Sequence, residues 1–111
     1  MTLRQQQSEF LVTVSKLIRF ATLTGIKVFV NEWYRTPERQ AELVKAGKSW
    51  ILNSKHIKGL AVDLIILKDN GGVSWDNADY EPLGEYWEKI GGEWGGRWKV
   101  VDSVHFQYKG G

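Results

Sequence analysis

The chain has 111 residues, enough for one domain with its own hydrophobic core. Its formal net charge is only +2 at pH 7, and its basic residues are scattered, which argues against nucleic acid as a partner. The lack of cysteine excludes disulfides and thiolate ligands, and no apolar stretch is long enough for a membrane span. We therefore expect a single domain over residues 1–111, monomeric and without a membrane anchor.

The sequence begins with a predicted amphipathic helix over residues 3–23. Apolar side chains recur there at steps of three and four residues, as they do on one face of a helix. Thr2 and Gln5 have the spacing of a capping box at its start. Gly25 follows the last turn, and glycine commonly ends helices because it accepts a left-handed conformation. This helix is expected to pack one face on the core.

A strand is predicted next, over residues 26–31, followed by a second helix. Thr36 offers a capping hydroxyl, and the proline after it suits the first helical position, so a helix is expected from Pro37 to Gly47. The following segment, 48–58, lacks either periodicity and is expected to be an irregular loop.

The second half of the sequence predicts more strand and one further helix. Residues 60–67 are rich in branched apolar side chains and predict a buried strand, and a turn is expected over 68–72. Asp79 is expected to cap a helix that reaches Ile90, and one or two short strands are expected over 98–108. The fold class predicted from this order is α+β, a small, mostly antiparallel sheet with helices packed against it.

Both histidines of the chain lie near aspartates in apolar segments. Asp63 interrupts the run from Leu60 to Ile66, where an unpaired carboxylate would be expensive to desolvate. Alternation along this strand directs Asp63 away from the face that its neighbours bury. Two imidazoles and a carboxylate are a common zinc set with one position left for water, so His56, Asp63 and His105 are candidate ligands. The same spacing also fits a surface histidine and an edge-strand aspartate.

Two further charged residues have the chemistry of a hydrolytic site. Asp102 lies three residues before His105 and would be free to act as a base on a metal-activated water. A solvated turn residue is the alternative for Asp102. Arg35 lies between a predicted strand and a capped helix, so its guanidinium would be rigidly placed to bind an oxyanion or a substrate carbonyl. A surface salt bridge is the alternative for Arg35.

Four segments together resemble one known family. They are Ser54-x-His56-x-x-Gly59-x-Ala61-x-Asp63-Leu64, Asp102-x-x-His105-Phe106, the stretch from Tyr34 to Gln40, and Trp94-Gly95-Gly96. In type and order they are similar to zinc D-alanyl-D-alanine carboxypeptidases and L-alanyl-D-glutamate endopeptidases, which include VanY-like enzymes and phage endolysins. The resemblance covers roughly residues 26–108. It implies the same α+β fold that the element order predicts.

The resemblance also implies roles for individual residues. It assigns His56, Asp63 and His105 as ligands of Zn²⁺, Asp102 as the general base and Arg35 as the residue that binds the substrate carbonyl. Two further expectations concern Ser54 and Gln40. Ser54 either donates to a substrate carboxylate or holds its own loop, and Gln40 either orients Arg35 or binds substrate. Arg97 departs from the family pattern, which often has an acidic residue there, so a different substrate contact is one interpretation.

The expected activity is hydrolysis of a peptidoglycan stem peptide, at an L-alanyl-D-glutamate bond by preference. A D-alanyl-D-alanine carboxypeptidase and a non-catalytic metal-containing wall-binding module are the alternatives. The first residues, 1–7, lack the apolar core of a secretory signal. We therefore expect a phage-type lysis enzyme that accumulates in the host cytoplasm and acts on the cell wall after release.

Overall fold

The computed structural model describes residues 1–48 and 54–110. Within these residues the helices are α1 (Leu3–Leu23), α2 (Pro37–Lys45), α3 (Asn77–Lys89) and the short 3-10 helices η1 (Lys55–Lys58) and η2 (Gly95–Arg97). The strands are β1 (Lys27–Glu32), β2 (Ala61–Leu67), β3 (Val73–Ser74), β4 (Glu93–Trp94) and β5 (His105–Gln107).

A small antiparallel sheet organises the molecule around β2. The strand order is β1-β2-β5-β4, and β3 pairs with the far end of β2. Every pairing is antiparallel, with β1 along one edge of β2 and with β5 and β3 sharing the other. The predicted α+β class, a small antiparallel sheet with packed helices, is confirmed.

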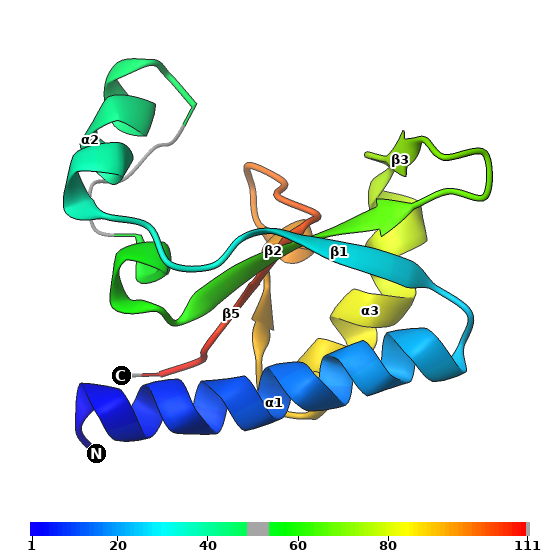
Figure 1. Ribbon diagram of the computed structural model, residues 1–111, viewed down its shortest axis with the longest axis horizontal. Helices are drawn as coiled ribbons and strands as arrows, with labels where there is room; N and C mark the ends of the chain where they lie inside the picture. The colour runs from blue at the N-terminus through cyan, green and yellow to red at the C-terminus, as the bar shows by residue number, and fades with distance from the viewer. Residues whose placement is uncertain (49–53, 111) are drawn as a thin grey trace.

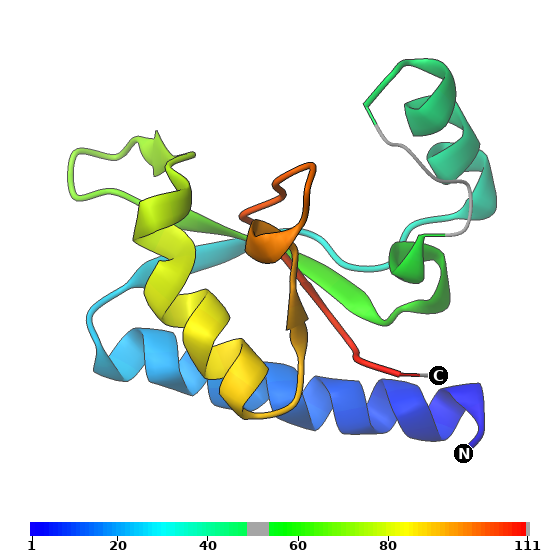
Figure 2. The same ribbon diagram turned by 180° about the vertical axis from the view of Figure 1, so that it is seen from behind.

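Helices α1 and α3 cover one face of this sheet, and α2 stands apart beside η1 (Figures 1 and 2). Alternation along β2 turns Val62 and Leu64 into the layer between sheet and helices, where both are fully buried. The core is one cluster of side chains from α1, β2, α3, β4, β5 and the residue just before β2: Phe10, Val14, Leu17, Ala21, Leu60, Val62, Leu64, Ile66, Tyr80, Leu83, Trp87, Trp94 and Phe106.

The caps of the first two helices agree with the sequence. The Thr2 hydroxyl accepts from the Gln5 backbone N–H while the Gln5 side chain accepts from the Thr2 N–H, which completes the capping box. Thr36 caps α2, with Pro37 as its first residue. Gly25 follows α1 with a φ of +78°, the left-handed conformation expected of a stop signal.

One expectation, the residue that caps α3, needs correction. Asp76, and not Asp79, caps α3, because its side chain accepts from the Ala78 N–H; the Asp79 carboxylate accepts from the Ser74 hydroxyl instead. The expectation of one or two short strands over 98–108 is confirmed, since β5 lies there. The two-residue strands β3 and β4 were not predicted, since two residues are too short to show an alternating pattern.

The expected loop over 48–58 is only partly within the described residues. Residues 49–53 lie outside them, and 55–58 form η1. Among the described helices, none combines the length and the apolar character needed to cross a lipid bilayer.

Candidate metal and active site

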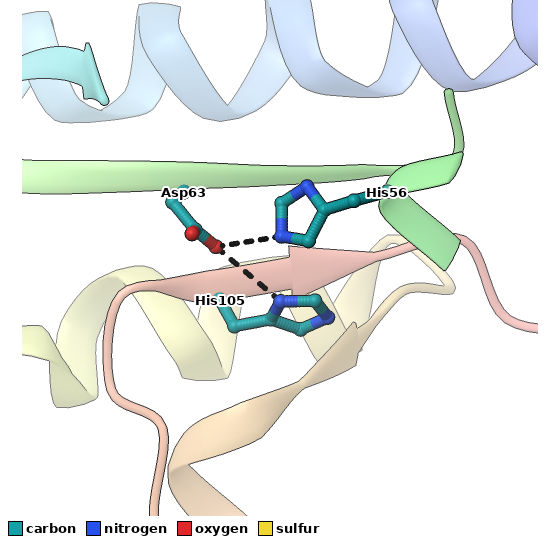
Figure 3. A group of neighbouring side chains, drawn as sticks. All are labelled: His56, Asp63 and His105. Carbon is teal, nitrogen blue, oxygen red and sulfur yellow. Dashed lines mark hydrogen bonds and ion pairs between the residues drawn. The ribbon is translucent and has the colours of Figure 1, made fainter. Parts of the chain in front are cut away.

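Three elements bring the predicted ligands together. Asp63 and His105 are direct partners across the β2–β5 pair, so their side chains share the face of the sheet opposite the core. His56 lies in η1, immediately before β2, and the Ser54 hydroxyl caps η1 by accepting from the His56 backbone N–H at 3.2 Å. Figure 3 shows both imidazoles directed at the Asp63 carboxylate.

The distances within this group are short. Asp63 Oδ1 lies 3.1 Å from His56 Nε2 and 3.3 Å from His105 Nδ1. The three candidate ligand atoms all lie within 4.8 Å of one another. Both histidines are buried, and the Asp63 side chain is only 13% exposed. The carboxylate therefore has little water to compensate its charge.

Each imidazole makes a hydrogen bond on the side away from Asp63, and this bond determines whether the ring nitrogen that faces Asp63 carries a proton. His56 Nδ1 lies 2.8 Å from the Trp33 carbonyl, which can only accept, so this nitrogen carries the proton. His105 Nε2 lies 2.8 Å from Gln107 Oε1 and donates in the same way. In the neutral imidazoles, His56 Nε2 and His105 Nδ1 then present lone pairs to a carboxylate oxygen. Three acceptors facing one another require a cation or a proton between them.

This donor set fits zinc. Zinc bound to nitrogen and oxygen at 2.0–2.1 Å in a tetrahedron holds its ligand atoms about 3.3 Å apart, which matches the two separations from Asp63 Oδ1. Two neutral imidazoles and one carboxylate leave a fourth position open, as catalytic zinc sites do. Histidine ligands usually donate their other ring N–H to an oxygen acceptor, as His56 does to the Trp33 carbonyl and His105 does to Gln107 Oε1.

The pKa shifts of Asp63 and His105 also indicate that these side chains share a positive charge. Burial alone would raise the pKa of Asp63, but hydrogen bonds and charge from His105 and His56 lower it to about 2. Burial likewise opposes charge on His105, but the hydrogen bond and charge of Asp63 raise its pKa above the ordinary value. Without a metal ion, a proton on His105 Nδ1 therefore turns the repulsion between this nitrogen and Asp63 Oδ1 into a hydrogen bond.

Asp102 lies next to the three ligands at the open side of the site. Its Oδ2 is 3.9 Å from His105 Nδ1, and its side chain is about half exposed. Partial burial raises the pKa of Asp102, against the opposing effect of the positive charge at His105. A carboxylate in this place is close enough to the metal position to exchange a proton with a molecule bound there.

Arg35 is held in the same site by partners on β1 and α2. Its Nε and Nη2 donate to the two carboxylate oxygens of Glu32 at 2.9 and 2.8 Å, and Nη1 donates to Gln40 Oε1 at 2.6 Å. Nη2 is also 3.9 Å from Asp63 Oδ2. Since a guanidinium has five N–H donors, two remain beyond these three bonds. The pairing with Glu32 lowers the pKa of that carboxyl group.

Two residues of the site, Glu32 and Gln107, were not predicted from the sequence. Glu32 reaches Arg35 because a register shift between Val30 and Glu32 sets Glu32 opposite Asp63. Gln107 follows His105 by two residues, so its side chain lies on the same face of β5 and reaches the imidazole. The two-residue spacing was a signal for Gln107, whereas the bulge that places Glu32 has no sequence signature.

A cleft of about 820 Å³ surrounds these groups. Its wall is formed by every predicted site residue except Gln40, which is fully buried behind Arg35, together with seven others. The lining residues are Arg35, Lys48, Ser54, Lys55, His56, Asp63, Trp98, Lys99, Val100, Val101, Asp102, His105 and Gln107.

Arg97, the departure from the family pattern, is not part of this cleft wall. Its guanidinium pairs with Glu81 at 2.8 Å and Glu88 at 3.3 Å, both on α3, and lies 4.9 Å above the Trp94 ring. These contacts fasten η2 to α3. The interpretation of Arg97 as a substrate contact has no support from this arrangement.

Comparisons with known proteins agree with the geometry. The family model described as D-alanyl-D-alanine carboxypeptidase, of the M15 peptidases, matches residues 47–108. The L-alanyl-D-glutamate peptidase of Listeria phage A118 is 36% identical over 101 residues, covering 86% of this chain. The peptidoglycan L-alanyl-D-glutamate endopeptidase CwlK of Bacillus subtilis strain 168 is 32% identical over 102 residues, covering 75% of this chain. The chain spans only 36% and 61% of the lengths of these two relatives.

Two solved structures share the fold. The L-Ala D-Glu endopeptidase ChiX of Serratia marcescens superposes with a TM-score of 0.70 at 35% identity, covering 84% of this chain and 75% of ChiX. The D,D-pentapeptidase VanY, in complex with Zn(II), superposes with a TM-score of 0.63 at 22% identity, covering 92% of this chain and 71% of VanY, and supports the fold alone. The family match over more than half of the sequence and the similarity to ChiX confirm the resemblance: this chain belongs to the M15 peptidase family.

Proposed function

We propose that this protein is a zinc-dependent peptidase that cleaves the L-alanyl-D-glutamate bond of peptidoglycan stem peptides. One observation carries the proposal. His56 Nε2, His105 Nδ1 and Asp63 Oδ1 converge as three acceptors on one point, with Asp102 and Arg35 beside it. A purely structural metal site needs neither a free carboxylate nor a fixed guanidinium. This is why we prefer an enzyme to a non-catalytic wall-binding module.

The roles of the residues follow from their positions. A bound zinc ion supplies a Lewis acid and lowers the pKa of water to about 7. Asp102 accepts a proton from the attacking water and delivers it to the nitrogen of the leaving amine. The two remaining N–H donors of Arg35 bind the carbonyl oxygen of the scissile bond as negative charge develops on it. Glu32 and Gln40 hold the guanidinium in place, so it need not reorganise during the reaction.

The choice of bond rests on the named relatives. The phage A118 protein, CwlK and ChiX are all named for the L-alanyl-D-glutamate bond. The family description names a D-alanyl-D-alanine carboxypeptidase, which keeps that activity as the second candidate. The two differ in product, because an endopeptidase opens the stem peptide internally and a carboxypeptidase removes its terminal residue.

Digestion of purified peptidoglycan distinguishes them. Mass spectrometry of the soluble products should show fragments with a new amino-terminal glutamate, together with a fall in the turbidity of the wall suspension. Free D-alanine should be scarce. Abundant D-alanine from pentapeptide stems, with no clearing of the suspension, would instead identify a carboxypeptidase.

We further propose that the protein acts as a monomer in phage-type lysis, reaching the wall from the host cytoplasm after the membrane is breached. The similarity to the Listeria phage peptidase supports this role. Production in a bacterial host should be harmless until a membrane-permeabilising agent is added and should then cause rapid clearing. Lysis without permeabilisation would contradict the proposed route.

A further inference from the structure

The cations of the active-site cleft fall into two groups. Four basic side chains line it, and two of them have partners within the protein. Arg35 is held by Glu32 and Gln40. The Lys55 ammonium donates to the carbonyls of Tyr108 and Gly110, at 2.6 and 3.0 Å, and so ties the C-terminal segment to η1.

The other two cations are Lys48 and Lys99. Neither forms an ion pair with a carboxylate of the described residues. The two aspartates that line the cleft lie beside the buried histidines. Lys48 and Lys99 are therefore the cleft cations still available to a ligand, and a cleft lined in this way favours an anionic group on the substrate.

Lys99 belongs to a loop whose base is fixed. We call residues 98–102 the rim loop, which follows η2 (Figure 2). The Gly95 carbonyl accepts from the backbone N–H of Trp98 at 3.2 Å and of Asp102 at 2.9 Å, and so closes the rim loop. The Trp98 ring lies 4.9 Å from the His105 ring. Lys99 thus follows a residue in contact with a metal ligand and precedes the proposed base by three positions.

The proposed reaction places the two halves of the substrate relative to this loop. Asp102 must reach the leaving nitrogen in order to protonate it, and that nitrogen belongs to the glutamyl residue. The glutamyl residue therefore lies against the end of the rim loop that carries Asp102. A glutamyl residue continues the peptide through one carboxyl group, and its other carboxyl group is an anion unless it is amidated.

We propose that Lys99 binds this free carboxylate and so makes the enzyme selective for the unamidated glutamyl residue. The inference rests on the proposed function, because it takes the position of the leaving amine from it. A lysine suits the task, since its ammonium is a compact charge on a flexible stem that can follow the substrate into the cleft.

Two synthetic peptides test this site. Both contain the L-alanyl-D-glutamyl bond, and they differ only in whether the free carboxyl group of the glutamyl residue is a carboxylate or a carboxamide. The zinc-loaded enzyme should cleave the carboxylate peptide with a kcat/KM about three- to fivefold higher, the range of a partly exposed ion pair. In Lys99→Gln this ratio should fall to about one. The wild-type ratio should also shrink as salt is added.

Two lysine variants serve as controls. Lys48→Gln removes the other available cation of the cleft, and Lys16→Gln removes an exposed lysine on α1, outside the cleft. Both should keep the wild-type ratio. A ratio near one in the wild type, a ratio unchanged in Lys99→Gln, or a ratio lost in Lys48→Gln would each overturn the assignment. If neither peptide is cleaved while D-alanine is released from pentapeptide, the proposed function itself fails, and the inference fails with it.

Discussion

At the scale of single residues, the hydrogen bonds that the two imidazoles make within the protein determine which of their atoms can bind a metal. His56 donates one ring N–H to the Trp33 carbonyl, and His105 donates one to Gln107. The other ring nitrogen of each histidine can then bind a cation shared with Asp63. Asp102 lies beside this group with its carboxylate half exposed. The same residue types with their lone pairs turned outward would not form a metal site.

Asp102→Asn separates the proposed base from the proposed metal ligands. The amide keeps the shape of the side chain but cannot accept a proton, so kcat should fall roughly a hundredfold or more. Zinc content, measured by atomic emission after dialysis, should stay at the wild-type level, because Asp102 is outside the ligand set. A variant that retains near-normal turnover would show that another group is the base.

Glu32→Gln tests how Arg35 is positioned. The amide replaces one of the two acceptor oxygens with a donor, so one hydrogen bond to the guanidinium should be lost and the other weakened; kcat should fall roughly tenfold, with zinc content unchanged. A double-mutant cycle provides the control: in an Arg35→Ala background, Glu32→Gln should cause no further loss of kcat. Additive losses would mean that Glu32 acts independently of Arg35.

At the scale of elements, the site depends on how β2, β5 and η1 meet. The alternating apolar residues of β2 predicted the face of the sheet on which Asp63 lies. Thr36 and Pro37 predicted the start of α2. The pairing of Asp63 with His105 was not predictable, because register across forty residues is set by packing and not by local pattern. For the same reason, the sequence identified Arg35 but not the bulge that brings Glu32 to it.

Gly95 offers a test of the rim loop. A Cβ built at this position would lie 2.5 Å from the Asp102 backbone carbonyl oxygen, too close for any real contact. Gly95→Ala should therefore displace Asp102, lower the free energy of unfolding by about 1–3 kcal/mol and reduce kcat. Thermal unfolding measures the loss of stability, and hydrolysis of an L-alanyl-D-glutamyl peptide measures the loss of kcat. Gly47→Ala, where no atom of the described residues lies within 4 Å of the added Cβ, is the control for turnover; it should lose some stability because its φ is +73°. Wild-type turnover in Gly95→Ala would contradict a fixed rim loop.

At the scale of the whole molecule, metal and protons compete for one buried group. The raised pKa of His105 in the metal-free protein means that its stabilising contribution is present below the ordinary pKa of about 6.5 and is lost as the pH rises through the folded-state value. Asp63, with a pKa near 2, keeps its contribution until strongly acidic conditions. Zinc, in contrast, requires both imidazoles unprotonated.

The increase in Tm caused by zinc should therefore grow as the pH is raised from about 5.5 to 8, because zinc stabilises the folded state by an amount that grows with the logarithm of its apparent affinity. Differential scanning calorimetry with and without zinc measures this increase. The same experiment on His105→Ala, which lacks a ligand, should give a small increase that changes little with pH. An increase in Tm that is independent of pH in the wild type would contradict competition at this site.

The most direct test of the central claim is a zinc titration of metal-free protein, followed simultaneously by bound zinc and by hydrolysis of an L-alanyl-D-glutamyl peptide. Activity should be absent at the start, should rise in step with occupancy, and should level off at one zinc per chain. Alanine variants of His56, Asp63 and His105 should bind zinc weakly and remain inactive. Hydrolysis by the metal-free protein, or full zinc occupancy without hydrolysis of this bond, would contradict the account.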